Sequence, residues 1–105
     1  ETRRLMAAAE DFDETQDNVC VQSEPKTDDA VEAHLEDELK KGDVTCVLVE
    51  PIQCSAGDLY QDETFFKKLR KLCTAYDVPL VFDEIQIGFG GTGKLWFFEH
   101  LDIEP

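Results

Sequence analysis

The sequence has few basic residues and no long apolar run. Among its 105 residues, Lys and Arg total 10 whereas Asp and Glu total 24, which gives a formal net charge of −14. A surface this acidic repels the phosphate backbone of DNA and RNA, so we exclude nucleic-acid binding by charge attraction. No apolar stretch reaches the about 18 residues that indicate a transmembrane helix, and the start of the chain lacks an apolar signal segment. These absences favour a cytoplasmic protein without a membrane partner.

Closely spaced metal ligands are also missing. The cysteines are Cys20, Cys46, Cys54 and Cys73, none of them in a CxxC pair, and the two histidines lie far apart in the sequence. A zinc site needs tighter ligand spacing than this, so we predict no metal centre. The pattern favours reduced cysteines in a cytosolic protein.

The excess of acidic over basic residues is largest in the first part of the chain. Residues 1–43 contain 14 acidic and 5 basic side chains, whereas residues 44–105 contain 10 and 5. We expect the front segment, with its loop and helix, to present an acidic and solvated surface. A chain of this length holds at most one domain.

Within the front segment, the pattern predicts a short helix from Glu1 to Ala9 and a loop from Glu10 to Asn18. A short β-type run, Val19 to Val21, follows. The clearest helix signal begins at Thr27, which can cap the helix, and stops at Gly42, which ends it. Its apolar stripe is narrow and repeats every four residues: Val31, Leu35 and Leu39.

The second segment indicates a strand, a helix and a strand. Val44 to Val49 is nearly continuous apolar sequence, which is typical of a strand buried on both faces of a parallel sheet. After a loop from Ile52 to Gln61, Asp62 can cap a helix whose apolar face continues to Tyr76. Asp77 to Phe82 then forms a second buried strand, so the segment predicts a right-handed βαβ unit.

These elements are few for an independent domain. All-parallel sheets need helices on both faces, and only about two substantial helices are expected here. Open strand edges and an uncovered sheet face would remain. We therefore infer that the chain is a slice of a larger α/β domain, or that it pairs tightly with other chains.

A carboxylate follows each of the two buried strands: Glu50 after the first and Asp83 after the second. In an open parallel sheet, ligands bind just beyond the carboxyl ends of the strands. These two residues are therefore candidate ligand-binding residues. The alternative, that they cap a helix or pair with a loop lysine, is equally compatible with the spacing.

A glycine-rich turn follows Asp83, with four glycines among residues 88–93. Glycine permits positive φ and close approach of the backbone to a ligand. The run from Gly91 to Lys94 has the residue types of a phosphate-binding loop but lacks the GxxxxGK[ST] spacing, since Leu95 follows the lysine. A small phosphate-binding protein and a plain flexible turn are the alternatives at this position.

Three stretches of the chain form a recognisable set. They are VEPIQ at Val49 to Gln53, LVFDEIQIGFGGTGKLW at Leu80 to Trp96, and FEHLDIEP at Phe98 to Pro105. Together they resemble the class III aminotransferases, pyridoxal-phosphate enzymes that include ornithine, acetylornithine, γ-aminobutyrate and lysine ω-aminotransferases. The resemblance covers residues 44–105 and only loosely residues 1–43. It implies an α/β fold in which residues 1–105 are part of a mostly parallel-sheet, aspartate-aminotransferase-like large domain that binds the cofactor.

The resemblance implies roles for individual residues. Asp83 would face the pyridine nitrogen of pyridoxal 5'-phosphate and keep it protonated, so that the ring can accept carbanion electrons. Gln86 would donate a hydrogen bond to the phenolic oxygen of the ring, and Glu84 would be structural. The substrate side would hold three residues that follow the first buried strand: Glu50, Gln53 and Ser55.

Two positions depart from the family pattern. Ser55 stands in the place of an acid that pairs with an arginine in many ω-aminotransferases, and serine cannot neutralise a guanidinium. Gly91 stands where arginine is common. The first departure affects the identity of the substrate. The second loosens the turn without touching the expected cofactor contacts.

The resemblance also implies parts that lie outside this chain. The family's Schiff-base lysine is expected beyond Pro105, and Lys94 is too early in the sequence to replace it, so no catalytic residue is assigned within the chain. The complete protein would be a homodimer that acts on a small amine or amino acid and a 2-oxo acid. The alternative is a catalytically inactive relative that serves as an interaction or oligomerisation module.

Overall fold

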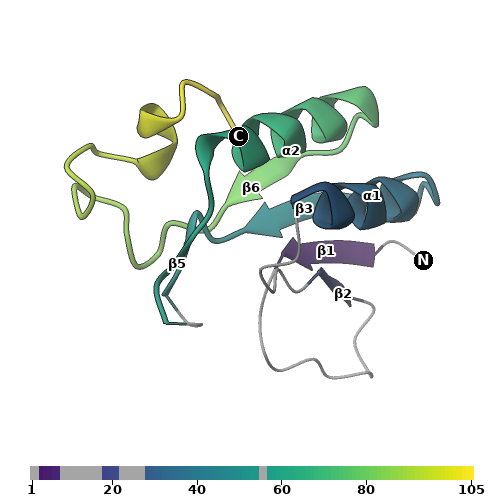
Figure 1. Cartoon of the computed structure of the whole chain (residues 1–105), viewed down its shortest axis with the longest axis horizontal. Coiled ribbons are helices and arrows are strands. Elements are labelled where there is room, and N and C mark those ends of the chain that lie inside the picture. The colour runs from purple at the N-terminus through teal and green to yellow at the C-terminus, as the bar shows by residue number, and fades with distance from the viewer. Residues whose placement is uncertain (1–2, 8–17, 22–27, 55–56) are drawn as a thin grey trace.

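The centre of the chain is a four-stranded, all-parallel sheet (Figure 1). The computed structural model describes residues 3–7, 18–21, 28–54 and 57–105. Within them the strand order is β2-β1-β3-β6, so β1 and β3 occupy the middle of the sheet. The strands are β1 (Arg3–Ala7), β2 (Asn18–Val21), β3 (Val44–Val49) and β6 (Leu80–Phe82).

Strand β1 shows that the predicted helix from Glu1 to Ala9 is wrong. Residues 3–7 pair in parallel with β2 on one side and with β3 on the other. The segment has only two large apolar residues, Leu5 and Met6, so neither a helical nor a strand period is apparent in it. Pairing on both sides satisfies its backbone groups and overrides the helix propensity of its alanines. The ends of the predicted helix lie outside the described residues.

Strand β2 confirms the β-type run from Val19 to Val21. It begins one residue earlier, at Asn18, a residue that the sequence pattern assigns to the preceding loop. The rest of that predicted loop, residues 10–17, lies outside the described residues.

Helix α1 (Asp28–Leu39) confirms the helix predicted in the front segment. Leu35 and Leu39 of its apolar stripe are buried. Gly42 follows with a φ of +73°, a conformation that glycine adopts at helix ends without steric cost. The predicted cap, Thr27, lies outside the described residues.

Helix α2 (Glu63–Ala75) confirms the second helix and its cap. The Phe65 N–H donates to Asp62 Oδ1 at 2.8 Å, which satisfies a backbone donor at the helix start. Lys68 Nζ lies 2.8 Å from Glu32 Oε2 of α1, so an ion pair also joins the two helices. The inner face of α2 holds four buried side chains: Phe65, Phe66, Leu69 and Cys73.

The elements β3, α2 and β6 form the predicted βαβ unit, because β3 and β6 are parallel neighbours. The loop expected after β3 contains a small antiparallel hairpin made of β4 (Ile52–Gln53) and β5 (Leu59–Tyr60). In Figure 1, β5 lies apart from the main sheet. A short 3₁₀ helix, η2 (Phe97–His100), follows the glycine-rich turn.

Helices α1 and α2 pack on one face of the sheet. Their buried side chains form a single cluster with Val47, Val49 and Leu80 of the strands. Side chains alternate along a strand, so Leu48 and Val81 point to the other face. There Leu48 is half-buried and Val81 is 40% exposed. The prediction that β3 is buried on both faces is therefore wrong for the described part of the chain, because both of its α-helices lie on the first face.

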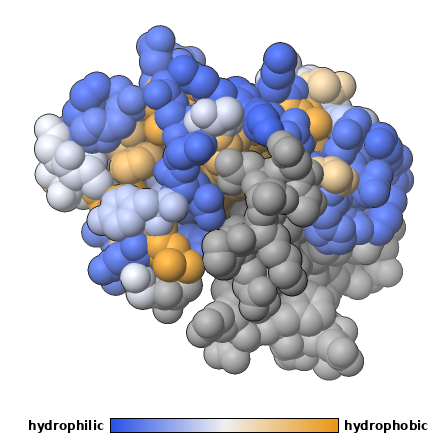
Figure 2. All heavy atoms as spheres, in the orientation of Figure 1, coloured by the Kyte–Doolittle hydropathy of each residue, from blue (hydrophilic) through white to orange (hydrophobic). Residues whose placement is uncertain are grey.

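The surface shown in Figure 2 is mostly hydrophilic, with apolar residues visible between the polar ones. Neither of the described α-helices is long and apolar enough to cross a membrane. Within the same residues, no group of three or more His, Cys, Asp or Glu side chains is placed to bind a metal ion.

Candidate functional site

Two carboxylates leave the sheet at the same edge. Val49 and Phe82 lie opposite each other in the parallel β3–β6 pair, and Glu50 and Asp83 directly follow them. The Asp83 N–H donates to the Val49 carbonyl at 2.8 Å and extends the ladder by one residue. The structure thus confirms that both carboxylates lie at the carboxyl ends of adjacent parallel strands.

Asp83 also begins a tight turn. Its Oδ1 accepts the N–H of Ile85 at 3.1 Å, so the side chain takes the place of a backbone acceptor. This hydrogen bond gives the Asp83 side chain a structural role in the turn that requires no ligand. A carboxylate offers about four lone-pair sites, so one such hydrogen bond leaves capacity for a further donor. Asp83 is only half-buried, which keeps this capacity accessible to a ligand.

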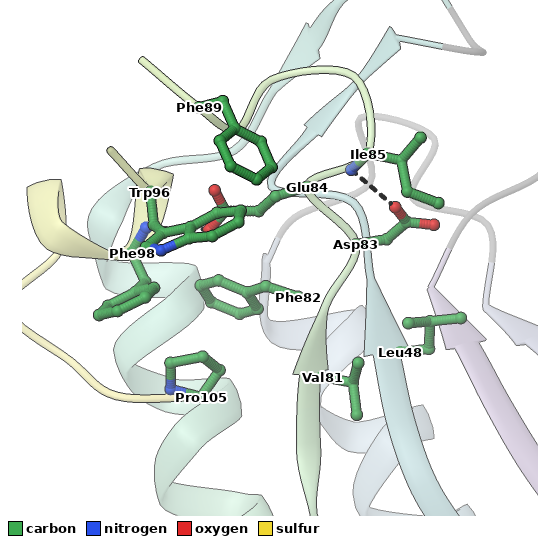
Figure 3. Close-up of a pocket in the computed structure, with 10 residues that line it drawn as sticks. All are labelled: Leu48, Val81, Phe82, Asp83, Glu84, Ile85, Phe89, Trp96, Phe98 and Pro105. Carbon is green, nitrogen blue, oxygen red and sulfur yellow. Dashed lines mark hydrogen bonds between the residues drawn. The ribbon is translucent and has the colours of Figure 1, made fainter. Parts of the chain in front are cut away.

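An apolar hollow of about 590 Å³ lies beside Asp83 (Figure 3). Leu48 and Val81 of the open sheet face line one part of it. The ring centroids of Phe89 and Trp96, on another part, are 4.9 Å apart. A flat ring with one polar atom fits such a space, because apolar groups cover the ring while the carboxylate binds the polar atom. The aromatic lining residues are Phe82, Phe89, Trp96 and Phe98.

Glu84 is directed away from Asp83 (Figure 3) and is 8% exposed. Its Oε2 accepts the Phe97 N–H at 2.6 Å, and its Oε1 accepts the Phe98 N–H at 3.2 Å. Both donors lie at the start of η2, so the negative carboxylate satisfies the positive end of this short helix. These bonds agree with the expectation that Glu84 is structural.

The turn after Glu84 requires glycine at Gly88. A Cβ at this position would lie 2.8 Å from Trp96 Cζ3 and 2.9 Å from the Glu84 carbonyl oxygen. Phe89 follows with a φ of +53°, which is uncommon for an aromatic residue, and it is 83% exposed. The glycine thus lets the Trp96 ring pack closely under the turn. The sequence patterns do not single out these aromatic residues as a lining, and their spacing around the glycines is a signal that indicates them.

The lysine of the glycine-rich turn makes a hydrogen bond to the backbone of this chain. Lys94 Nζ donates to the Glu99 carbonyl, and Glu99 Oε1 accepts the Trp96 N–H at 2.8 Å. These contacts tie the end of the turn to η2. They disfavour the phosphate-loop alternative, because the ammonium group is held by a carbonyl rather than directed toward an anion site.

The structure describes three of the other four predicted site residues. Gln86 is exposed in the turn after Asp83, and Glu50 is half-buried. Gln53 is buried in β4. Ser55 lies outside the described residues. The roles assigned to these residues stay predictions.

The surroundings of Cys54, close to Glu50, favour the protonated thiol. Burial raises its pKa, and a hydrogen bond to Asp58 together with the charges of Asp58 and Glu50 raises this pKa further. Cys54 lines a second hollow of about 450 Å³ with Tyr60 and His100. A neutral thiol contributes little to catalysis there, because the thiolate is the reactive form.

The family model for aminotransferase class III matches residues 4–105. The chain belongs to the class-III aminotransferases. The acetylornithine aminotransferase of Prochlorococcus marinus subsp. pastoris is 51% identical to this class-III chain over 59 residues, which are 56% of the chain and 14% of that protein. The L-lysine-epsilon aminotransferase of Mycobacterium bovis is 41% identical over 68 residues, which are 65% of the chain and 15% of that protein.

A solved structure of the family supports the fold. Plasmodium falciparum ornithine delta-aminotransferase matches 99% of this class-III aminotransferase chain with a TM-score of 0.82 and 31% identity, and the match covers 25% of that structure. The chain therefore corresponds to a small part of its relatives' length. The resemblance to class III aminotransferases and the α/β fold are confirmed. The family match begins at residue 4, so it includes the front segment more fully than the sequence motifs indicated.

Proposed function

We propose that the complete protein is a pyridoxal-5'-phosphate-dependent aminotransferase that transfers an amino group from a small amine or ω-amino acid to a 2-oxo acid. Membership of the class-III family supports this activity. The observation that carries the proposal is the position of Asp83. It is a carboxylate with spare acceptor capacity at the carboxyl end of a parallel strand, beside an apolar hollow.

The residues around Asp83 fit this cofactor. Pyridoxal phosphate contains a flat ring with a basic nitrogen, and a carboxylate within hydrogen-bond distance favours the protonated nitrogen. Apolar surroundings lower the local dielectric constant and strengthen this charge pairing. When bound, the cofactor supplies an electron-accepting ring for chemistry at the amine-bearing carbon. Asp83 holds the proton on the ring nitrogen while negative charge develops, which stabilises the transition state.

Gln86 is proposed to donate a hydrogen bond to the phenolic oxygen of the ring. It lies on the same turn as Asp83 and is exposed, so its amide is available to a ligand. Glu50, Gln53 and Ser55 are the proposed substrate-side residues. Ser55 carries a neutral hydroxyl, so it cannot neutralise a cationic group on the protein or the substrate.

The lysine that binds the cofactor covalently is proposed to lie outside residues 1–105, since Lys94 is held at the end of the glycine-rich turn. We place the complete protein in the cytoplasm as a homodimer. The free cysteines Cys46, Cys54 and Cys73 favour a reducing compartment. The exposed Val81 favours cover by further protein on the open sheet face.

Cofactor binding and amino transfer by the complete protein test this proposal. We expect it to give a visible absorption band with pyridoxal phosphate, and to transfer an amino group from ornithine, N-acetylornithine or lysine to a panel of 2-oxo acids. A protein that binds the cofactor but uses no amino donor would support the inactive relative instead. A protein that does not bind the cofactor would overturn the proposal.

A further inference from the structure

We infer that Glu84 is a positioning residue, which holds Asp83 in place for the ring nitrogen of the cofactor. This role rests on the proposed function, because it acts only through Asp83. The two residues are adjacent in the sequence, yet their side chains point to opposite sides of the chain (Figure 3). Asp83 reaches the hollow, whereas both carboxylate oxygens of Glu84 are engaged by backbone N–H groups.

Asp83 is anchored on both sides along the backbone. On its N-terminal side, its N–H donates to the Val49 carbonyl of β3 at 2.8 Å. On its C-terminal side, the Glu84 carboxylate binds the N–H groups of Phe97 and Phe98, and the Glu84 carbonyl accepts the Gly88 N–H at 2.8 Å. The backbone between these anchors therefore has little freedom to rotate.

The C-terminal anchor is itself fixed to the core. The ring of Phe97, which donates its N–H to Glu84, packs on Phe66 with a centroid distance of 6.1 Å and an interplanar angle of 62°. Phe66 is fully buried, and Leu101 just after η2 is buried as well. Glu84 thus ties the end of β6 to an element that is packed against α2.

This arrangement matters because catalytic groups must be placed accurately. A displacement of about 1 Å can cost about a hundredfold in rate. The carboxylate of Asp83 has one local hydrogen bond of its own, to the N–H of Ile85, so its direction depends on the backbone that carries it. Glu84 also lines the hollow, but both of its carboxylate oxygens accept backbone N–H groups, which leaves Asp83 as the carboxylate with capacity for the cofactor.

Glu84→Gln in the complete holoenzyme tests this role. Glutamine keeps the shape but replaces one oxygen with an NH₂ group, which cannot accept a hydrogen bond. We expect the Kd of pyridoxal phosphate to rise about tenfold and kcat to fall by a similar factor, with KM for the amino donor within about twofold. We also expect a shift in the pH at which the absorption band of the bound cofactor changes.

Glu99→Gln is the matched control. Glu99 also accepts a backbone N–H at η2, from Trp96 at 2.8 Å, but it is exposed and does not adjoin Asp83. We expect this variant to leave the cofactor Kd and the absorption band unchanged. A Glu84→Gln enzyme that melts at a lower temperature but keeps the parent Kd, kcat and band would overturn the inference.

A double-mutant cycle with Asp83→Asn decides whether Glu84 acts through its neighbour. We expect the effect of Glu84→Gln on cofactor binding to fall below about twofold once Asp83 is replaced, since coupled residues are not additive. Fully additive effects would overturn the inference. If Glu84→Gln does not fold, Glu84→Asp replaces it in the cycle. Its shorter carboxylate keeps the charge and should give a smaller change of the same sign.

The two proposals fail in different ways. If Asp83→Asn alone leaves cofactor binding and the absorption band unchanged, the proposed role of Asp83 is wrong and the role of Glu84 is wrong with it. If Asp83→Asn changes both but Glu84→Gln changes neither, only the positioning role of Glu84 is wrong.

Discussion

The two faces of the sheet differ in how completely they are packed. On the helix-covered face, Val47 and Phe66 are 0% exposed, whereas Val81 on the other face is 40% exposed and Ile85, in the turn after β6, is 92% exposed. Burial of apolar surface stabilises a fold by about 25 cal/mol per Å², so the covered face supplies most of the stability of this chain. The open face adjoins the hollow beside Asp83. Most of the buried core thus lies on one side of the sheet, whereas the hollow adjoins the other side.

Successive residues of one strand contribute side chains to the two faces of the sheet. Phe82 packs on Phe66 with a centroid distance of 5.5 Å, and it also lines the hollow together with its neighbours Val81 and Asp83. Alternation along a strand places adjacent side chains on opposite faces. A change in the core can therefore move a residue of the site, whereas a change in the site leaves most of the core contacts intact.

Among the substitutions that test the difference between the two faces, Phe66→Ala is expected to have the largest effect on stability. The Phe66 ring is fully buried and packs edge-on against three other rings. We expect the free energy of unfolding to fall by about 3–5 kcal/mol in chemical denaturation of the complete protein, because a large cavity forms in the core. Phe66→Leu, which leaves a smaller cavity, should cost less than half as much. A loss below about 1 kcal/mol for the alanine variant would contradict the assignment of stability to this face.

On the open side, Asp83→Asn should affect activity more than stability. Asparagine keeps the size but lacks the charge that holds the ring proton, so we expect kcat to fall by about 10²–10³-fold. Asp83→Glu keeps the charge with one extra methylene and should retain part of the activity. Single-turnover rates with cofactor bound separate the two variants. If Asp83 only caps its turn, asparagine should be nearly silent and glutamate worse. Faster turnover by the asparagine variant would show that the cofactor role is wrong.

The sequence patterns of residues 44–105 predict β3, α2 and β6, although β6 begins at Leu80 rather than at the predicted Asp77, whereas those of β1 do not predict a strand. β3 is a continuous β-branched run, and α2 has both an apolar face and the cap Asp62, so each pattern suffices locally. The five residues of β1 have no clear period. Their strand conformation depends on β2 and β3, which pair with them from both sides. The sequence of a short segment alone does not show which strands will pair with it.

The same limit applies to the candidate site. The position of Asp83 could be predicted, because a carboxylate after a buried strand must emerge at the sheet edge. The aromatic lining could not, because it depends on the close approach of Trp96 to Gly88 and on the reach of Glu84 to Phe97, 13 residues away. These contacts depend on the backbone conformation of the turn. The glycines permit this conformation, but they do not determine it.

A pH-dependent effect is expected from Cys73 on the covered face. Burial raises the pKa of its thiol from 9.0 to about 11. The thiol of the unfolded chain therefore ionises first, so this contribution is fully present below pH 9 and is lost as the pH rises toward 11. We expect the parent protein to lose about 2 kcal/mol more stability than Cys73→Ala between about pH 8 and pH 11. Equal slopes in denaturation of the two proteins would contradict the burial of this thiol.

A smaller effect is expected from the cap of the helix that covers the sheet. Asp62 is itself exposed, but its Oδ1 accepts the Phe65 N–H at the start of α2. We expect Asp62→Ala to lower the free energy of unfolding by about 1 kcal/mol, and Asp62→Asn to change it by a few tenths, because asparagine caps nearly as well. Urea denaturation of both variants measures this. Equal losses would show that the charge, rather than the hydrogen bond, stabilises the helix.

The smallest effect is expected when residues 1–105 are produced alone. In the described sheet, β2 and β6 each have one unpaired edge; the open face exposes Val81, and the turn after β6 exposes Ile85 and Phe89. The net charge of −14 opposes self-association, so added salt should promote it by screening. We expect association in analytical ultracentrifugation that Ile85→Ser weakens a few-fold. Leu59→Ser, on β5 away from the open face, should leave association unchanged. A chain that stays monomeric at every salt concentration and melts cooperatively would show that the open face needs no cover. The exposure of Val81 would then not support the proposal that further protein covers this face.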